Sequence, residues 1–407
     1  NGEDFKKTIC SHPLKSMGYE YDVPMLKGEF VTLEQGTGIV HAAPSHGPDD
    51  FNLCLKHGIK ASNTINDGGL YSDEIPFFSG LHIFKADKQV IEKLSEHRSL
   101  LGNGKLQHSF PHSWRSKAPL VYRATSQWFI SMEKKNLRKK ALKAIDDTDF
   151  YPERGRARIR AMIETRPDWC VSRQRIWGVP LPLFVSKKTK EPLKDPEVIE
   201  NIAKIYEKEG SDCWFTDNPQ KFLGKKYKKE DYIKTSDIVE VWFDSGASHS
   251  YVLEKRKDLM WPASMYLEGS DQHRGWFHSS LLESCGTRGR APYKSILTHG
   301  FVVDGKGLKM SKSTGNVIAP EDILKKYGAD ILRTWVAASD YSEDLKLDHS
   351  ILEQHAESYR KIRNTFRFLL GNLNDKKNNF DLNSKDIEKW PELERFILHQ
   401  IFSLNKK

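Results

Sequence analysis

The sequence predicts a protein of several domains whose central part is an α/β fold with a parallel sheet. Its 407 residues exceed the usual size of a single hydrophobic core. Between residues 235 and 345, short apolar runs typical of strands alternate with runs of helical period, and this alternation favours a parallel sheet. After residue 345 the apolar residues recur at helical spacing alone, which indicates a further, helical domain.

The first 106 residues predict a compact α+β or barrel-like module. β-like runs lie at 30–33 and 38–41, a cluster of turn residues at 66–69, and one helical pattern at 86–96. The segment 107–186 that follows is rich in aromatic and arginine residues.

Residues 187–234 predict a peripheral insertion. This segment is rich in Lys and Glu, and it has few large apolar residues beyond Trp214, Phe215 and Phe222. In the central part that comes next, β-like and helical runs alternate at 238–243, 264–267, 276–285, 295–303 and 323–336.

The last part of the chain predicts an amphipathic helix with a basic flank. Apolar residues recur there at spacings of three, four or seven, with arginine and lysine residues among them. The apolar positions are Leu352, Tyr359, Ile362, Phe366, Leu369, Leu370 and Leu373.

Composition narrows the class of protein and the kind of partner. An excess of 64 Lys and Arg over 55 Asp and Glu gives a net charge of +9, which favours a polyanionic partner such as nucleic acid. The five cysteines are far apart, so neither a zinc knuckle nor a disulfide framework is predicted, and a reducing compartment fits best. No apolar run approaches the roughly 18 to 20 residues of a membrane span.

The loop at residues 305–316 reads Gly-Lys-Gly-Leu-Lys-Met-Ser-Lys-Ser-Thr-Gly-Asn. Lys309 and Lys312 are three residues apart on a stretch rich in glycine and hydroxyl groups, so they can close over a polyphosphate and neutralise charge that develops during phosphoryl or nucleotidyl transfer. The alternative is a basic loop that only faces water.

A second polar motif occupies residues 266–277, after a strand-like run and before a helix. Open α/β sheets bind ligands at this position, beyond the carboxyl ends of their strands. A carboxylate suits an ammonium group or ribose hydroxyls, and Gly269 lets the backbone approach a ligand closely. Taken alone, the motif is equally compatible with a polar strand end that has no function.

Together, the two motifs resemble the lysine-serine loop and the adenylate-binding motif of the isoleucyl-tRNA synthetase branch of the class I aminoacyl-tRNA synthetases, of bacterial and organellar type. The resemblance is long and nearly continuous over residues 1–407, and it is weakest in the Lys-rich insertion. It implies the second half of a Rossmann-like catalytic domain, with part of an α+β or β-barrel editing domain and the start of an α-helical anticodon-binding domain.

The resemblance also implies roles for individual residues. The counterpart of Glu268 holds the α-ammonium of isoleucine, and Lys309 and Lys312 are the catalytic lysines. Contacts with the adenylate and its nucleotide are implied for Gly269, Asp271, Gln272, His299, Gly300 and Val302. The two indole walls of the amino-acid pocket are implied to be Trp242 and Trp276, for which the alternative is ordinary packing in the core.

An editing site is implied by the segment 36–51. An apolar pocket is known to discriminate isoleucine from valine by only about 1 to 3 kcal/mol, so hydrolytic editing of mischarged valine is needed. In the family, the counterpart of Asp50 anchors the ammonium of the misattached amino acid, and that of His41 shapes the pocket. The rival interpretation is a metal hydrolase that uses His41, His46, Asp49 and Asp50 as ligands.

Two family features are missing from the sequence. The His-Ile-Gly-His-type signature is absent, and so is the threonine-rich strand of the editing pocket. We therefore expect an internal fragment that begins inside the editing insertion and is itself deficient in adenylation and deacylation. Serines at 113 and 116 stand where several relatives have cysteines, so no metal site is predicted.

The expected domains are residues 1–106 (partial editing domain), 107–186 (catalytic domain), 187–234 (insertion), 235–345 (catalytic domain with the lysine loop) and 346–407 (start of the anticodon-binding domain). The expected function is ATP-dependent ligation of isoleucine to its tRNA, with ATP entering as its Mg²⁺ complex. The expected location is the cytoplasm or, alternatively, the mitochondrial matrix. The alternative function is an inert tRNA-binding or scaffold protein derived from a synthetase.

Overall fold

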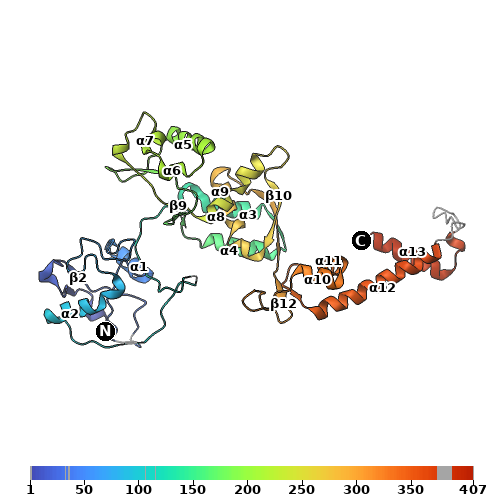
Figure 1. Cartoon of the computed structure of the whole chain (residues 1–407), viewed down its shortest axis with the longest axis horizontal. Coiled ribbons are helices and arrows are strands. Elements are labelled where there is room, and N and C mark those ends of the chain that lie inside the picture. The colour runs from blue at the N-terminus through green and yellow to red at the C-terminus, as the bar shows by residue number, and fades with distance from the viewer. Residues whose placement is uncertain are drawn as a thin grey trace. The chain divides into compact units, whose positions relative to one another are not determined.

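The computed structural model describes residues 2–32, 34, 37–105, 107–114, 116–373 and 387–406, and it contains two compact units, 1–128 and 129–407 (Figure 1). In the first unit, strands β1 (Ile9–Ser11) and β2 (Asp22–Pro24) pair antiparallel. Its α-helices are α1 (Pro48–Lys56) and α2 (Asp87–Glu96), so the helix expected at 86–96 is confirmed.

The strands expected at 30–33 and 38–41 are wrong for the described residues of those runs, and Leu33 lies outside them. Ile39 and Val40 are more than half exposed, and they pair with no strand among the described residues. A barrel needs every strand to have a neighbour on both sides. The described residues of this unit therefore form an α+β arrangement around one two-stranded sheet and not a closed barrel.

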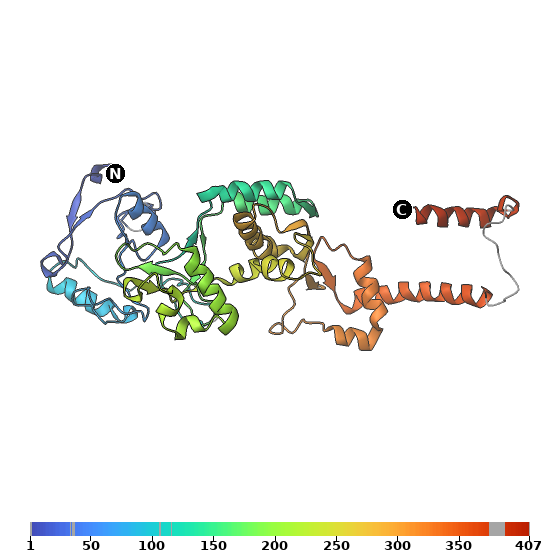
Figure 2. The ribbon, with the colours of Figure 1, turned by 90° about the horizontal axis from the view of Figure 1, so that it is seen from above.

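The centre of the second unit is a parallel sheet in the order β10 (Ala263–Gly269), β11 (Tyr293–His299) and β4 (Asp149–Tyr151). Helices α3 (Leu137–Asp146) and α4 (Arg154–Glu164) lie side by side, as Figure 2 shows in teal, and α3 also packs on α9 (Trp276–Thr287). Their apolar faces meet the sheet in a core that contains Phe150, Ile159, Tyr266, Phe277 and Ile296. The predicted parallel sheet is confirmed.

Three of the predicted runs are divided in the structure. The run 238–243 forms only the short strand β9 (Ile238–Val239) before helix α8 (Val241–Gly246) begins. The run 295–303 splits into β11 and β12 (Val302–Asp304), and 323–336 splits into α10 (Pro320–Tyr327) and α11 (Ala329–Ala338). The last break lies at Gly328, whose φ of +85° favours glycine and ends a helix.

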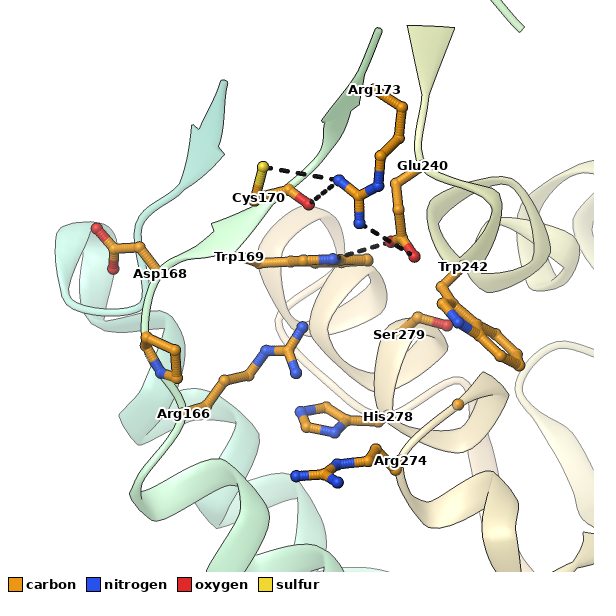
Figure 3. Close-up of a pocket in the computed structure, with 12 residues that line it drawn as sticks. Arg166, Asp168, Trp169, Cys170, Arg173, Glu240, Trp242, Arg274, His278 and Ser279 are labelled. Atoms are coloured by element: carbon orange, nitrogen blue, oxygen red, sulfur yellow. Dashed lines mark hydrogen bonds and ion pairs between the residues drawn. The ribbon is translucent and has the colours of Figure 1, made fainter. Parts of the chain in front are cut away.

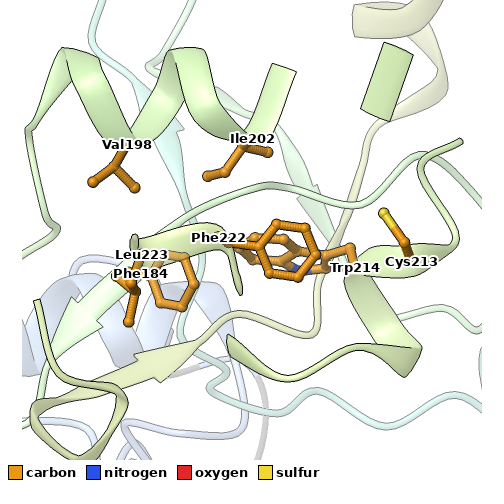
Figure 4. Packing of buried hydrophobic residues seen from close by; sticks show 7 residues of the cluster. All are labelled: Phe184, Val198, Ile202, Cys213, Trp214, Phe222 and Leu223. Carbon is orange, nitrogen blue, oxygen red and sulfur yellow. The ribbon is translucent and has the colours of Figure 1, made fainter. Parts of the chain in front are cut away.

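The insertion has a hydrophobic core of its own (Figure 4). It is built from β7 (Phe184–Ser186), α5 (Pro196–Glu209), α6 (Cys213–Thr216), α7 (Pro219–Leu223) and β8 (Tyr232–Lys234). Trp214 and Phe222 are fully buried in this core, whereas Phe215 is 44% exposed. The few large apolar residues of this segment are therefore enough to fold a small module around themselves.

The C-terminal part contains the predicted amphipathic helix, α12 (His349–Leu373), followed by α13 (Glu392–Asn405). Leu352 is buried against α10, α11 and strand β13 (Leu345–Leu347), which pairs parallel with β12. Farther along α12, Ile362 and Phe366 are more than half exposed. The part of the expected helical domain at 374–386 lies outside the described residues.

The remaining elements are short. Two-stranded antiparallel pairs are formed by β3 (Phe129–Ile130) with β5 (Trp169–Cys170), β6 (Ser172–Arg173) with β9, and β7 with β8. The short helical turns are η1 (Gly2–Phe5), η2 (Lys15–Met17), η3 (Ile83–Lys85), η4 (Lys134–Asn136), η5 (Lys229–Asp231), the π-helical η6 (His249–Glu254), η7 (Ser270–His273) and η8 (Ile387–Lys389). Within the described residues, no helix is both long and apolar enough to cross a membrane.

Candidate active site

The carboxyl edge of the parallel sheet brings the polar motif after β10 together with His299 and Gly300, two of the residues implied by the resemblance. Glu268 and Gly269 end β10, where they lie in register with Thr298 and His299 of β11. Parallel strands present their carboxyl ends at one edge, so the turn η7 and the Gly300 position open at the same place. Glu268 is exposed there, and its carboxylate makes no hydrogen bond or ion pair with any described residue, so it is available to a ligand.

The turn after β10 is held by its own side chains. Gln272 donates from Nε2 to Oδ2 of Asp271 over 3.1 Å, and its Oε1 accepts from the N–H of Trp276 over 2.9 Å. The second bond satisfies one of the unpaired donors at the start of α9. A Cβ at Gly269 would lie 2.8 Å from Oδ1 of Asp271, so a larger residue there would displace the Asp271 side chain.

His273 has a place in this turn that the sequence reasoning missed. Its ring is buried, and Nδ1 donates to the carbonyl of Ser270 over 2.8 Å. Nε2 faces Gly155 of α4, where a Cβ would lie 3.0 Å away. The imidazole thus connects the turn to the neighbouring helix. In the sequence, only its position directly after Gln272 indicates that this histidine belongs to the turn.

His299 and Gly300 end the second strand at a tight contact. A Cβ at Gly300 would overlap the backbone of Glu343, and the N–H of Gly300 donates to the carbonyl of Tyr341 over 2.8 Å. Glycine is therefore needed where two backbones meet. Val302, on β12, is 43% exposed.

A cavity of about 340 Å³ lies beside this strand end, with Gly300, Ser270, Thr298 and His273 among its lining residues. Arg154, on the opposite wall, forms an ion pair of 2.6 Å with Glu343.

The two tryptophans predicted as pocket walls have different surroundings. Trp276 stacks on Tyr266, with ring centroids 3.9 Å apart and planes at 5°, and its Nε1 donates to Ser248 Oγ over 2.9 Å. Trp242, on α8, is 41% exposed, and its ring fits against Gly275, where a Cβ would lie 2.9 Å from it. Both indoles therefore border the start of α9, but only Trp242 lines the adjoining cavity.

That cavity has a volume of about 300 Å³, and it is lined by residues of α8, of α9, of the turn before α9 and of the segment 166–173 (Figure 3). Glu240 is buried at its wall, where Oε2 accepts from Nε1 of Trp169 over 3.1 Å and Oε1 lies 3.7 Å from Nη2 of Arg173. The wall thus combines aromatic surface with several charged groups.

The lysine loop is fixed at its base and open at its tip. Asp304, at the end of β12, accepts from the N–H groups of Lys306 and Leu308 over 3.0 and 2.8 Å. Asn316 donates to its other oxygen over 2.9 Å, and this bond is the main cause that lowers the pKa of Asp304. Lys309 and Lys312 are exposed, and neither ammonium forms an ion pair with a described carboxylate. Both are therefore free to contact a ligand.

The predicted editing residues lie in the first unit. Helix α1 begins at Pro48 after Gly47, and Asp50 lies in its first turn, where an acidic side chain is favoured. Oδ2 of Asp50 accepts from the N–H of Ala43 over 3.0 Å, which ties the preceding loop to the helix. His41 is exposed in that loop.

His46, a ligand in the rival metal interpretation, has both ring nitrogens engaged. Nδ1 donates to the carbonyl of Tyr122 and Nε2 accepts from the hydroxyl of Thr64, each over 2.9 Å. Within the described part of the chain, no group of three or more His, Cys, Asp or Glu side chains is arranged to hold a metal ion.

The surroundings of Glu283, on α9, predict how the stability of the fold depends on pH. Its Oε1 is buried without a hydrogen-bond partner in the described structure. Burial is the main cause that raises the pKa of Glu283, to about 9, and Asp244 and Glu240 add to the rise. Between its ordinary pKa of 4.5 and its raised pKa of about 9, the Glu283 carboxyl is protonated in the folded chain and ionised in the unfolded chain. Its contribution to the stability of the fold is therefore fully present at low pH and is lost as the pH rises toward 9.

Glu283→Gln should therefore raise the midpoint of thermal unfolding at pH 7.5 by about 2 to 4 °C. The gain should disappear as the pH falls below 4.5, where both states become protonated. Circular dichroism melts at several pH values test this. Glu254→Gln is the contrasting control, because a hydrogen bond from Arg288 lowers the pKa of Glu254, and its loss should cost stability at neutral pH. A Glu283→Gln gain that does not change with pH would contradict the assignment.

Comparisons with known proteins agree with one another. A family model described as tRNA synthetases class I (I, L, M and V) matches residues 17–348. Isoleucine-tRNA ligase of Pelagibacter ubique is 75% identical over 99% of this chain and 45% of that protein. The proteins of the same description from Gluconobacter oxydans and Geobacter sulfurreducens are 49% and 51% identical, over 99% and 98% of this chain and 43% of each relative. The chain thus spans less than half the length of these relatives.

Among solved structures, methionyl-tRNA synthetase of Mycobacterium tuberculosis in complex with methionyl-adenylate matches 61% of this chain and 41% of its own, at 18% identity and a TM-score of 0.39.

Proposed function

The chain belongs to the class I tRNA synthetases, and on that premise we propose that the whole protein ligates isoleucine to its tRNA. The isoleucine carboxylate attacks the α-phosphate of ATP, which enters as its Mg²⁺ complex, and pyrophosphate leaves. The acyl group of the resulting adenylate then passes to the 3′-terminal ribose of the tRNA. The identity of 75% to an isoleucine-tRNA ligase supports isoleucine as the amino acid.

The observation that carries this proposal is the register of the sheet's carboxyl edge. Glu268 and Gly269 lie beside Thr298 and His299. After β11 the chain forms the short strand β12, and the lysine loop begins directly after that strand. In the proposed reaction, Glu268 binds the ammonium of isoleucine and the turn after it binds the adenylate. Lys309 and Lys312 stabilise the charge on the phosphoryl group, so catalysis comes from positioning and electrostatics.

The test is isoleucine-dependent exchange between ATP and pyrophosphate by the whole protein. Exchange that needs isoleucine, and that valine supports more weakly, is the expected result. The alternative function, an inert tRNA-binding or scaffold protein derived from a synthetase, predicts tRNA binding without exchange.

The role of Glu268 gives a second prediction. Glu268→Ala in the whole protein should weaken isoleucine binding at least about tenfold and leave ATP binding unchanged, because a partly desolvated ammonium loses its counter-charge. Equilibrium dialysis with each ligand measures both effects. Glu268→Gln is the matched variant, since it keeps the size of the side chain and removes only the charge. Equal losses for both ligands would mean that Glu268 supports the fold instead.

We also propose that the first unit belongs to an editing domain that hydrolyses mischarged valyl-tRNA, with Asp50 as the ammonium anchor and His41 as a wall of the pocket. The domains proposed from the sequence are 1–106 for editing, 107–186 and 235–345 for catalysis, 187–234 for the insertion and 346–407 for the anticodon-binding part. The insertion is extended to include β7, because Phe184 belongs to its core and β7 pairs with β8. The proposed location is the cytoplasm, with the mitochondrial matrix as the alternative.

A further inference from the structure

The cavity shown in Figure 3 has a cationic end that the proposed function does not use. The guanidinium groups of Arg166 and Arg274 lie on either side of the His278 ring in this view. Burial is the main cause that lowers the pKa of His278, to about 3, and the two guanidinium charges lower it further. Arg274 also lowers the pKa of Arg166, so the three side chains lie close enough for each to act on the next.

His278 lacks the partners that a buried imidazole normally has. It is 3% exposed, and neither ring nitrogen has a well-formed hydrogen bond with a described residue, although the backbone of His273 lies near enough to raise its pKa. Nε of Arg166 is likewise buried and unpartnered, and its guanidinium carbon lies 5.4 Å from the centre of the Trp169 ring. A buried polar group without a partner destabilises the fold, so an occupant with acceptor atoms would relieve this cost.

The two acidic residues that line the cavity do not balance this charge. Glu240 raises the pKa of Arg166 by its charge. This one carboxylate is shared with Trp169 and Arg173, as described above, so it offsets only part of the positive charge. Asp168 points away from the cavity in Figure 3, and its Oδ1 accepts from the N–H of Met132 over 2.8 Å. Neither Arg166 nor Arg274 forms an ion pair with any carboxylate of the described residues.

We propose that this end of the cavity binds a tetrahedral oxyanion of the phosphate class, held by Arg166, Arg274 and His278. One guanidinium group can donate two parallel hydrogen bonds to two oxygens of a phosphate. Two guanidinium groups with an imidazole between them offer donors from several directions, and this arrangement suits a tetrahedral anion better than a planar one. The cavity of about 300 Å³ is larger than one phosphate, so the anion can be free or part of a larger phosphorylated ligand. Its negative charge would favour protonation of His278.

Isothermal titration of the chain with inorganic phosphate, at constant ionic strength and pH 7, tests the site. Saturable binding is expected, at least tenfold weaker in Arg166→Gln and in Arg274→Gln. Arg256→Gln is the control, because Arg256 is an exposed arginine that pairs with Asp258 at 2.6 Å outside the cavity lining. Absence of saturable binding, an equal loss in the control, or equally tight binding of acetate would overturn the proposal.

A second measurement needs no variant. The ring nitrogen signals of His278 in the unmodified chain should shift toward the imidazolium values as phosphate is added, and they should stay unchanged if the site does not exist. Competition then identifies the source of the phosphate group. Displacement of inorganic phosphate by pyrophosphate alone indicates a free polyphosphate, whereas displacement by a short single-stranded RNA indicates a phosphodiester. Both outcomes support the oxyanion site.

Discussion

Lys312→Ala in the whole protein should lower the rate of isoleucyl-adenylate formation by about 10²-fold to 10³-fold, with little change in isoleucine affinity. This is the scale for loss of one preorganised donor to charge that develops in the transition state. The loop supports such a role because Asp304 and Asn316 fix its base while the ammonium of Lys312 is exposed and makes no ion pair with a described residue.

Pyrophosphate exchange at saturating isoleucine and ATP measures this rate. Lys306→Ala is the matched control: Lys306 is another exposed lysine of the same loop, and its N–H, which bonds to Asp304, is kept in the variant. Lys306→Ala should change the rate by less than about twofold, because it removes only one exposed positive charge from the loop. A Lys312→Ala variant with normal turnover and weakened isoleucine binding would show that the lysine binds substrate and does not stabilise the transition state.

The sequence predicted the polar carboxyl edge of the sheet because the signals there are local. The strand-like run at 264–267 precedes the polar motif 268–272 and the helix at 276–285 directly, so order along the chain is enough to locate the motif at a carboxyl end. The start of α1 at Pro48 follows an equally local signal, since proline and acidic residues mark the first turn of a helix.

Predictions that depend on contacts between distant segments were less accurate. The run 295–303 reads as one strand, but the backbone of Glu343 approaches so closely at Gly300 that the strand is interrupted there. The two indoles read as a pair, yet Trp276 stacks on Tyr266 while Trp242 borders the cavity. Local pattern contains no information about which distant segment will pack at a given residue.

The cationic end of the cavity was missed for a related reason. Arg166 belongs to an arginine-rich stretch and His278 to an apolar helix, so neither is unusual in its own segment. They become unusual only when folding buries His278 without a partner and brings two guanidinium groups to it. Burial of a polar group without a partner is visible in three dimensions alone.

Asp50→Ala in the whole protein should abolish hydrolysis of valine that is misattached to the tRNA for isoleucine, and it should leave isoleucine activation intact. The proposed ammonium anchor is lost, whereas the catalytic edge lies in a different unit of the chain. The variant also loses the bond from the N–H of Ala43 to Oδ2, so Asp50→Asn is the informative companion. It keeps an oxygen that can accept this bond but removes the charge, and it should keep the loop folded while deacylation stays lost.

Deacylation is measured alone, on preformed valyl-tRNA, with Asp49→Ala as the control, because Asp49 is an exposed carboxylate in the same first turn of α1. If Asp50 acts through its charge on the substrate ammonium, substrate and backbone groups can position the attacking water without a metal ion. EDTA should then leave the rate of deacylation unchanged. If EDTA stops deacylation and zinc restores it, the metal-hydrolase interpretation is correct. In that case Asp50 and His41 are metal ligands, and the loss in Asp50→Asn reports a missing ligand and not a missing counter-charge.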